Sequence, residues 1–532
     1  MELVRKLINR RLPGIAFWGS LIILSAIGIL LLVYSTPFGP GLINDSVIYL
    51  GGAENILAGD GYSRTSGGGE IKPITVNPPF YPMVVAAVSL FGFSFIKSGW
   101  LISLACFFLN VILVGVLLRK LTRSDLLALL GAFLFTLSES FIKAHTFALT
   151  EPLFITISLA SLLSISQYLD NGRMRYLVFS AILVNLSYLT RYIGIATLGA
   201  GLLALIVFQP TWKTRIKDSL IYLGLSLVGG ILWMARNLIV SGNAANRSIG
   251  FHPLTLDKIR EGVETFWVWI LPNRFNLTQK IPALWDILTY LFIILFVIGL
   301  VHAWVRYIQG KITNEQPSAR SARLALILAS WAVLYFVALL FSLTFADAST
   351  ALENRILAPL FTALLILFIF GVRQLLLEPQ KTIQIVGLAL VLLISASFVY
   401  DGRRAVIDLR QDGQGYTSSY FRNSPTIEMV QKLPPVILYS NRVPAINLLA
   451  DRTAYALLAP VDPLTRQPRP GYQETLESIR NSVLEGKSVL VVFEAQDVFG
   501  DPVEGGWLRD LTKGVPVLAE NTDGIIYGKI TQ

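Results

Sequence analysis

The chain has 532 residues, of which 54% are hydrophobic and 15% charged, and its basic residues exceed the acidic ones by 10. A water-soluble protein of this length could not cover so much apolar surface, so the composition predicts an integral membrane protein in contact with membrane lipids. The basic excess is typical of cytoplasmic loops in such proteins and does not indicate a nucleic-acid partner. The single cysteine, Cys106, excludes an intramolecular disulfide, and the three histidines lack a metal-ligand spacing.

Eleven apolar runs are candidates for membrane spans, since a helix needs about 20 such residues to cross the hydrocarbon core. The first, Ile15–Tyr34, follows a basic stretch and has no small-residue cleavage site after it. It therefore reads as an uncleaved anchor with its N-terminus in the cytoplasm. The other ten runs, several of them short, are Gly99–Leu118, Leu126–Ser138, Pro152–Leu169, Tyr176–Thr190, Tyr192–Trp212, Ser219–Ala235, Ile287–Val305, Leu324–Ala346, Ile356–Val372 and Thr382–Tyr400.

Loop charges predict the orientation of these spans. Every second connection is short and basic, which places it on the cytoplasmic side: Arg119–Arg123, Arg173–Arg175, Lys213–Lys217, Arg306–Arg323 and Arg373–Lys381. The pattern alternates only if the number of spans is odd. The apolar segment Pro82–Ile96 is therefore expected to be an interfacial or half-inserted helix and not a twelfth span.

Three large pieces then lie outside the cytoplasm. The first outer loop covers Ser35–Tyr81, and the second covers Arg236–Trp285, where two tryptophans suit an interfacial helix. The third piece is the tail, so we divide the chain into a membrane domain, 1–400, and an extracytoplasmic domain, 401–532. In the tail, short buried-strand patterns alternate with helical patterns, which predicts a small α/β domain. The strands are Val436–Tyr439, Ser488–Phe493 and Gly524–Ile530, and the helices lie near Thr426–Leu433, Ala445–Leu449 and Tyr472–Leu484.

Five short motifs stand at predicted outer ends of the helices. They read Asn44-Asp45-Ser46-Val47-Ile48-Tyr49, Asn77-Pro78-Pro79-Phe80-Tyr81-Pro82, Thr150-Glu151-Pro152, Leu189-Thr190-Arg191, and Arg355 followed four residues later by Pro359. In order and spacing, this set resembles the GT-C class of glycosyltransferases. The nearest pattern is the bacterial branch that includes protein O-mannosyltransferases and lipid A aminoarabinose transferase. The resemblance covers roughly residues 10 to 400 and implies a GT-C-like fold.

The resemblance also implies an activity. A GT-C enzyme of this branch moves a sugar, with inversion, from a polyprenyl-phosphate carrier to a glycan, lipid or protein acceptor on the outer face of the inner or plasma membrane. We expect no required cofactor and predict no metal site, although a divalent cation stays open. Such chemistry needs a carboxylate that accepts the proton of the acceptor hydroxyl. It also needs positive groups that stabilise the departing lipid phosphate.

Asp45 is the candidate general base. The alternative is an ordinary cap, since Asp before an amphipathic run suits a helix N-terminus. The family often has a second acidic residue where this chain has Ser46, which disfavours a two-carboxylate or metal-assisted mechanism.

Arg191 and Arg355 are the candidate ligands of the donor phosphate, because a guanidinium group binds phosphate through two hydrogen bonds. Their alternative is interfacial snorkelling at a helix end. The aminoarabinose type has a lysine where this chain has Asn77, so Lys72 or Arg64 is a candidate replacement.

Glu151, Tyr81 and Asn77 are expected to line the substrate cavity. For Glu151 the alternative is a favourable charge at a helix N-terminus, next to a proline that suits the first helical turn. For Tyr81 it is an interfacial aromatic anchor.

Other functions compete with the glycosyltransferase reading. A transporter or flippase of a lipid-linked sugar would be expected to have internal repeats and charged residues in mid-membrane, but the apolar runs are almost free of charge. A surface-glycan ligase or polymerase and a membrane-anchored receptor are further alternatives. The candidate residues cluster instead at outer helix ends, which favours an interfacial enzyme.

Overall fold

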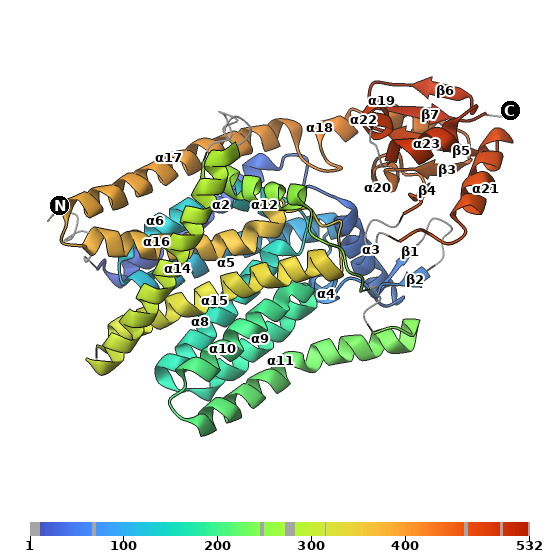
Figure 1. The fold of residues 1–532 in the computed structure, drawn as a ribbon. Helices are drawn as coiled ribbons and strands as arrows, with labels where there is room; N and C mark the ends of the chain where they lie inside the picture. The colour runs from blue at the N-terminus through green and yellow to red at the C-terminus, as the bar shows by residue number, and fades with distance from the viewer. Residues whose placement is uncertain are drawn as a thin grey trace.

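The computed structural model describes residues 11–65, 71–244, 249–271, 282–313, 315–461, 467–500 and 504–529. Long helices form a bundle, and a small sheet with its own helices sits at one end of it, opposite the N-terminus (Figure 1). The second outer loop and the last predicted strand fall partly outside the described residues.

Each of the eleven predicted spans is a helix in the structure. Among the described residues, eight helices are long and apolar enough to cross a membrane: α2 (Gly14–Ser35), α5 (Phe95–Thr122), α8 (Glu151–Asn171), α11 (Trp212–Ser241), α14 (Pro282–Ile312), α15 (Gln316–Phe345), α16 (Asn354–Leu377) and α17 (Lys381–Asp412). A ninth candidate is a pair bent by 56°, α6 (Asp125–Leu137) and α7 (Glu139–Thr146), which is either one broken span or a re-entrant loop. The remaining two are shorter: α9 (Met174–Thr190) and α10 (Ile195–Phe208), the latter preceded by a 3-10 turn. The multi-pass helical architecture is therefore confirmed.

The segment predicted to lie at the interface is the short helix α4 (Phe80–Ser89). Ten residues rise only about 15 Å along a helix, which is half of what a membrane span requires. One face of α4 is buried against its neighbours through Tyr81 and Val85, while Leu90 and Phe91 just after it are strongly exposed. This helix is consequently too short to add a twelfth crossing.

Where the second outer loop was predicted to contain an interfacial helix, the structure has the helix α12 (Leu256–Ile270). Its two tryptophans are buried in the protein, so they anchor α12 to the bundle. The ring of Trp269 stacks on Phe361 of α16 at 4.3 Å, and the Trp269 indole nitrogen donates to Ser138 at the α6–α7 bend, at 3.2 Å.

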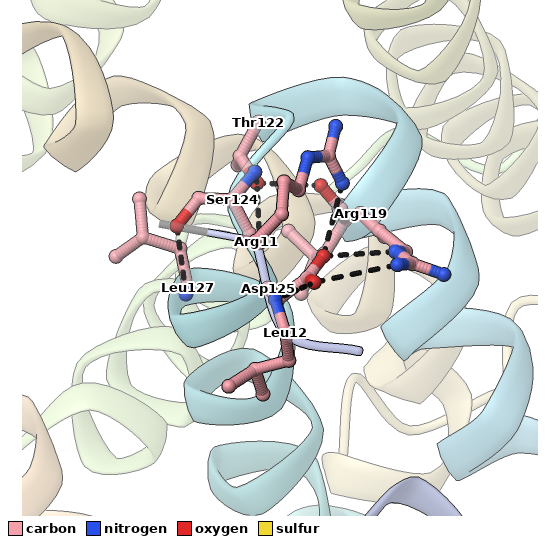
Figure 2. A network of polar contacts seen from close by, with 8 residues as sticks. Arg11, Leu12, Arg119, Thr122, Ser124, Asp125 and Leu127 are labelled. Carbon is pink, nitrogen blue, oxygen red and sulfur yellow. Dashed lines mark hydrogen bonds and ion pairs between the residues drawn. The ribbon is translucent and has the colours of Figure 1, made fainter. Parts of the chain in front are cut away.

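Ion pairs connect the ends of neighbouring helices at the end of the bundle away from the sheet. The fully buried Asp125 carboxylate binds Arg119 Nε at 2.8 Å, Arg11 Nη1 at 2.9 Å and the backbone nitrogen of Leu12 at 2.8 Å (Figure 2). Nearby, Asp170 of α8 pairs with Lys120 of α5 and Arg323 of α15. Several basic residues of the predicted cytoplasmic loops thus meet at one end of the bundle. Which side of the membrane this end faces stays a prediction.

The C-terminal part contains a five-stranded sheet in the order β4-β3-β5-β7-β6. Strands β4, β3 and β5 are parallel, and β7 runs antiparallel to both of its neighbours, β5 and β6. The predicted strands are present as β3 (Ile437–Ser440), β5 (Ser488–Phe493) and β7 (Gly524–Tyr527). Every residue of β5 is buried, as in a central strand covered on both faces. The other elements are α18 (Ser419–Arg422), α19 (Pro425–Lys432), α20 (Val443–Ala445) continued by a π-helix (Ile446–Ala450), α21 (Tyr472–Leu484), α22 (Ala495–Gly500), α23 (Glu504–Thr512), β4 (Ala454–Ala456) and β6 (Val517–Glu520).

Replacing Asp125 tests whether its buried ion pairs stabilise the helix bundle. Asp125→Asn leaves two arginines beside a neutral group, and breaking a buried charge pair costs about 3 to 5 kcal/mol. We therefore expect a clear loss of thermal stability of the detergent-solubilised protein. The control Asp257→Asn removes an exposed pair with Arg260 at 3.9 Å and should leave the melting temperature unchanged. Equal stability of the two variants would contradict the structural role of Asp125.

Candidate active site

Four of the predicted site residues meet at the bundle end that carries the sheet. Asp45 lies in the first turn of α3 (Asn44–Ala58), Glu151 begins α8, Arg191 follows α9, and Arg355 lies in the first turn of α16. Arg191 Nη1 is 2.7 Å from Glu151 Oε1, while Arg355 Nη1 is 3.8 Å from the same oxygen and 3.6 Å from Asp45 Oδ2. We call these four residues the charged cluster.

The charged cluster runs from the interior to the surface. The Glu151 side chain is 1% exposed, the two arginines are 20% and 23% exposed, and Asp45 is 45% exposed. A buried carboxylate is tolerated only when its charge is balanced, and two guanidinium groups balance Glu151. The N-terminus of α8 adds its dipole, and Pro152 suits the first turn of that helix. Glu151 is consequently the buried member of the cluster, and Asp45 is its accessible member.

Both arginines that were predicted to bind phosphate already have acidic partners. Besides Glu151 and Asp45, Arg355 contacts Glu353, whose Oε1 lies 2.5 Å from Arg355 Nε. Arg191 Nη1 also donates to Thr150 Oγ1 at 2.9 Å. With Glu353 included, two positive charges face three negative ones, so the group carries a net charge of −1. A lipid phosphate therefore has to share these arginines with the carboxylates.

The other two basic candidates lie on a separate element. Arg64 in β1 (Ser63–Thr65) and Lys72 in β2 (Ile71–Pro73) are directly opposite each other in an antiparallel hairpin, and both are exposed. Arg236 of α11 holds this hairpin by donating to the carbonyl oxygens that flank it, those of Tyr62 and Ile74, at 2.9 and 2.6 Å. The hairpin thus presents two adjacent positive charges outside the charged cluster.

Two tyrosines near Asp45 are both buried. Tyr49 lies one helical turn after Asp45 on α3, and its hydroxyl accepts from Asn77 Nδ2 at 3.2 Å. Burial, followed by the charge of Asp45, raises the pKa of Tyr49 to about 12, so its hydroxyl keeps its proton at neutral pH. Tyr81 packs edge-on against Tyr49 at 5.6 Å and is completely buried. Tyr81 therefore packs behind Tyr49 in the protein interior and is not exposed to a substrate.

Three neighbours of the cluster were not predicted as site residues. Tyr49 had a usable signal, because positions i and i+4 share a helix face with Asp45. Thr150 and Glu353 adjoin predicted residues in the sequence, but nothing in their pattern indicated a contact with an arginine. Among the described residues, no three His, Cys, Asp or Glu side chains gather to hold a metal ion. The divalent cation stays an open prediction.

An apolar groove of about 600 Å³ lies between α12, α14, α16 and α17. Its lining is almost entirely hydrocarbon and aromatic, with Trp269 and Phe398 among its residues and Glu378 at the far end of α16. Trp269 and Phe398 also line a small hollow with Asn354, the residue before Arg355. The α16 residues of the groove run from Leu364 to the far end of the helix, and the groove meets the hollow beside Asn354 at Trp269 and Phe398.

Comparisons with known proteins agree with this architecture. Residues 76–237 match the family model described as dolichyl-phosphate-mannose-protein mannosyltransferase, a segment that contains Glu151 and Arg191. No curated protein is significantly similar to the chain in sequence.

Solved structures with similar folds cover nearly the whole chain. ArnT from Cupriavidus metallidurans in the apo state has a TM-score of 0.56 and 14% identity over 96% of this chain and 98% of its own. The same ArnT bound to undecaprenyl phosphate has a TM-score of 0.51 and 15% identity, over 97% and 98%. AglB from Archaeoglobus fulgidus, in complex with an inhibitory peptide and a dolichol-phosphate, has a TM-score of 0.53 and 13% identity, over 95% and 73%. The chain thus has the GT-C fold, and its residues 76–237 match the mannosyltransferase family model, which confirms the predicted resemblance to this class of enzymes.

Proposed function

We propose that this chain is an inverting membrane glycosyltransferase. It takes a sugar from a polyprenyl-phosphate carrier and transfers it to a hydroxyl group of a glycan, lipid or protein acceptor at the outer face of the inner or plasma membrane. In this orientation the N-terminus is cytoplasmic and the C-terminal sheet is extracytoplasmic. The observation that carries the proposal is the charged cluster, in which an accessible carboxylate stands 3.6 Å from an arginine that is anchored on a buried glutamate.

Asp45 suits the role of base because its carboxylate is the exposed member of the cluster. The acceptor oxygen attacks the anomeric carbon of the sugar while its proton passes to Asp45. A new carbon–oxygen bond forms, and the bond from the anomeric carbon to the phosphate oxygen breaks on the opposite face. The electron pair leaves with the polyprenyl phosphate, whose charge becomes more negative by one.

Arg355 couples the two halves of this step. When Asp45 accepts the proton it loses its charge, so the guanidinium group of Arg355 loses one of its anionic partners. At the same moment the leaving phosphate gains a negative charge and replaces that partner. The total charge around Arg355 therefore stays nearly constant through the reaction.

Glu151 is better suited to hold the arginines than to act as a second base. Its carboxylate is buried and lies between Arg191 and Arg355, at 2.7 and 3.8 Å. A group in this position keeps both guanidinium groups in place without reaching the acceptor.

The apolar groove supports a lipid-linked donor. A prenyl chain has no polar group to satisfy, and the groove offers it an almost purely hydrocarbon lining. The groove shares Trp269 and Phe398 with the hollow beside Asn354, so a prenyl chain whose phosphate points toward that hollow would direct it to the end of α16 that carries Arg355.

The base is tested by Asp45→Asn. The purified protein in detergent is given radiolabelled undecaprenyl-phosphate sugars, with an envelope extract as the source of acceptors. The variant should transfer sugar about 100- to 10,000-fold more slowly while still binding undecaprenyl phosphate. The control Glu54→Gln changes an exposed carboxylate on another face of the same helix and should transfer normally.

Undiminished transfer by Asp45→Asn would remove Asp45 as the base. If the parent protein transferred none of a panel of sugars, the glycosyltransferase proposal would fail. Translocation of the same lipids in sealed vesicles would then establish the transporter reading.

The groove is tested by filling it. Gly299 and Gly371 line it and have open space at the position of a Cβ atom, so tryptophan at either site would occupy the groove. We expect Gly299→Trp and Gly371→Trp to raise the KM for an undecaprenyl donor about tenfold, through lost burial of the prenyl chain. Transfer from a short-chain analogue should change little. Gly19→Trp on α2, which is equally uncrowded, is the control. An unchanged KM in both groove variants would place the prenyl chain elsewhere.

A further inference from the structure

The connection between the last membrane helix and the C-terminal domain passes directly beside the residue before the candidate base. Three stretches of backbone lie next to one another here: one precedes α8, one precedes α3 and one follows α17. Gly41 N donates to Thr146 O at 2.9 Å, and Ala148 N donates to Gly41 O at 3.1 Å. On the other side, Tyr416 N donates to Leu42 O at 2.8 Å.

Glycine is required where the third stretch approaches. At Gly415 the backbone φ is +59°, and a Cβ atom would lie 2.1 Å from the carbonyl oxygen of Leu42. Any side chain at this position would push the connection away from the first outer loop. Thr417 Oγ1 donates to Pro40 O at 3.0 Å and Gln414 Nε2 to Thr146 Oγ1 at 2.5 Å, so side chains reinforce the same contact.

Tyr416 carries this contact to the first turn of α3. Its hydroxyl donates to Asn44 Oδ1 at 2.5 Å, one residue before Asp45. The tyrosine itself is buried, and its ring packs edge-on against Phe421 at 5.2 Å, which in turn packs against Phe493 at the end of β5 at 6.0 Å. A row of rings therefore joins the core of the sheet to the beginning of α3.

Apart from the ion pair between Asp45 and Arg355, the first turn of α3 has no side-chain cap. The residue preceding the helix is Ile43, whose side chain cannot accept a hydrogen bond from the free N–H groups of that turn. Ser46 Oγ instead accepts from the Ile43 nitrogen at 3.2 Å. Because the Asp45 carboxylate is half exposed, its position depends on how firmly this turn is held.

We infer that Tyr416 is a positioning residue, through which the C-terminal domain fixes the first turn of α3 and with it the carboxylate of Asp45. The inference rests on the proposed function, since it gives Asp45 the role of base. A base has to be held within a fraction of an ångström of the acceptor proton, and a single displaced turn would lengthen that distance. The domain would thus contribute to the rate of transfer without touching the sugar donor.

The test compares Tyr416→Phe with the parent chain at full length. The variant keeps the ring and loses only the hydroxyl group. Transfer from the radiolabelled undecaprenyl-phosphate sugars is divided by the number of undecaprenyl phosphate binding sites, which corrects for unfolded protein. We expect kcat per binding site to fall about 5- to 20-fold with the donor KM unchanged. The control Tyr420→Phe removes a hydroxyl that binds Asp523 O at 3.0 Å within the C-terminal domain and should keep the parent rate.

Asn44→Ala supplies a second measurement. If the hydrogen bond is what matters, Asn44→Ala should be as slow as Tyr416→Phe, and the double variant no slower than either. A normal kcat per binding site in Tyr416→Phe, or full additivity of the two losses, would overturn the inference. Asp45→Asn in the same assay separates the two proposals: if it transfers normally, the proposed function fails whatever Tyr416 does.

Discussion

The site depends on one buried charge, the carboxylate of Glu151, which is shared between Arg191 and Arg355. Because this carboxylate is 1% exposed, it is stable only while both guanidinium groups remain beside it. The sharing brings three elements together at one point: the start of α8, the turn after α9 and the start of α16. Arg355 extends the network to Asp45, so an ion pair holds the accessible carboxylate of the first loop beside the membrane helices.

The same end of the bundle is closed from above by the chain's own C-terminal domain. Backbone pairing of Gly415 with Leu42 and the hydroxyl of Tyr416 bring the domain onto the first outer loop. The hairpin that carries Arg64 and Lys72 is attached on the other side by Arg236. Two further features thus adjoin the first outer loop: the hairpin, with its two exposed basic residues, and the C-terminal domain, which reaches Asn44 through Tyr416. Because the charged cluster together with Glu353 has a net negative charge, the positive charges of the hairpin favour the approach of an anionic lipid headgroup.

Much of this was readable from the sequence, because apolar runs and helix-end motifs are local signals. Each apolar run is a helix in the structure, including the short α9 and α10, and the motifs at the helix ends brought Asp45, Glu151, Arg191 and Arg355 together. What could not be predicted depends on partners far away in the chain. Tyr416 lies hundreds of residues from Asn44, and no local pattern reveals that pairing. The strands β4 and β6 are three and four residues long with mostly exposed positions, so they leave no apolar run to detect. Likewise, a pattern of single residues indicated that Arg355 would lie at a helix end but not that three carboxylates would surround it.

The central claim is that the donor phosphate replaces Asp45 as the anionic partner of Arg355 during transfer. The most direct measurement is a cryo-electron microscopy structure of the full chain with undecaprenyl phosphate bound. The account predicts the phosphate within ion-pair distance of Arg355, on the side facing Asp45, with the prenyl chain in the groove along α16. A phosphate bound only by Arg64 and Lys72, with Arg355 still paired to Asp45 and the groove unoccupied, would contradict it.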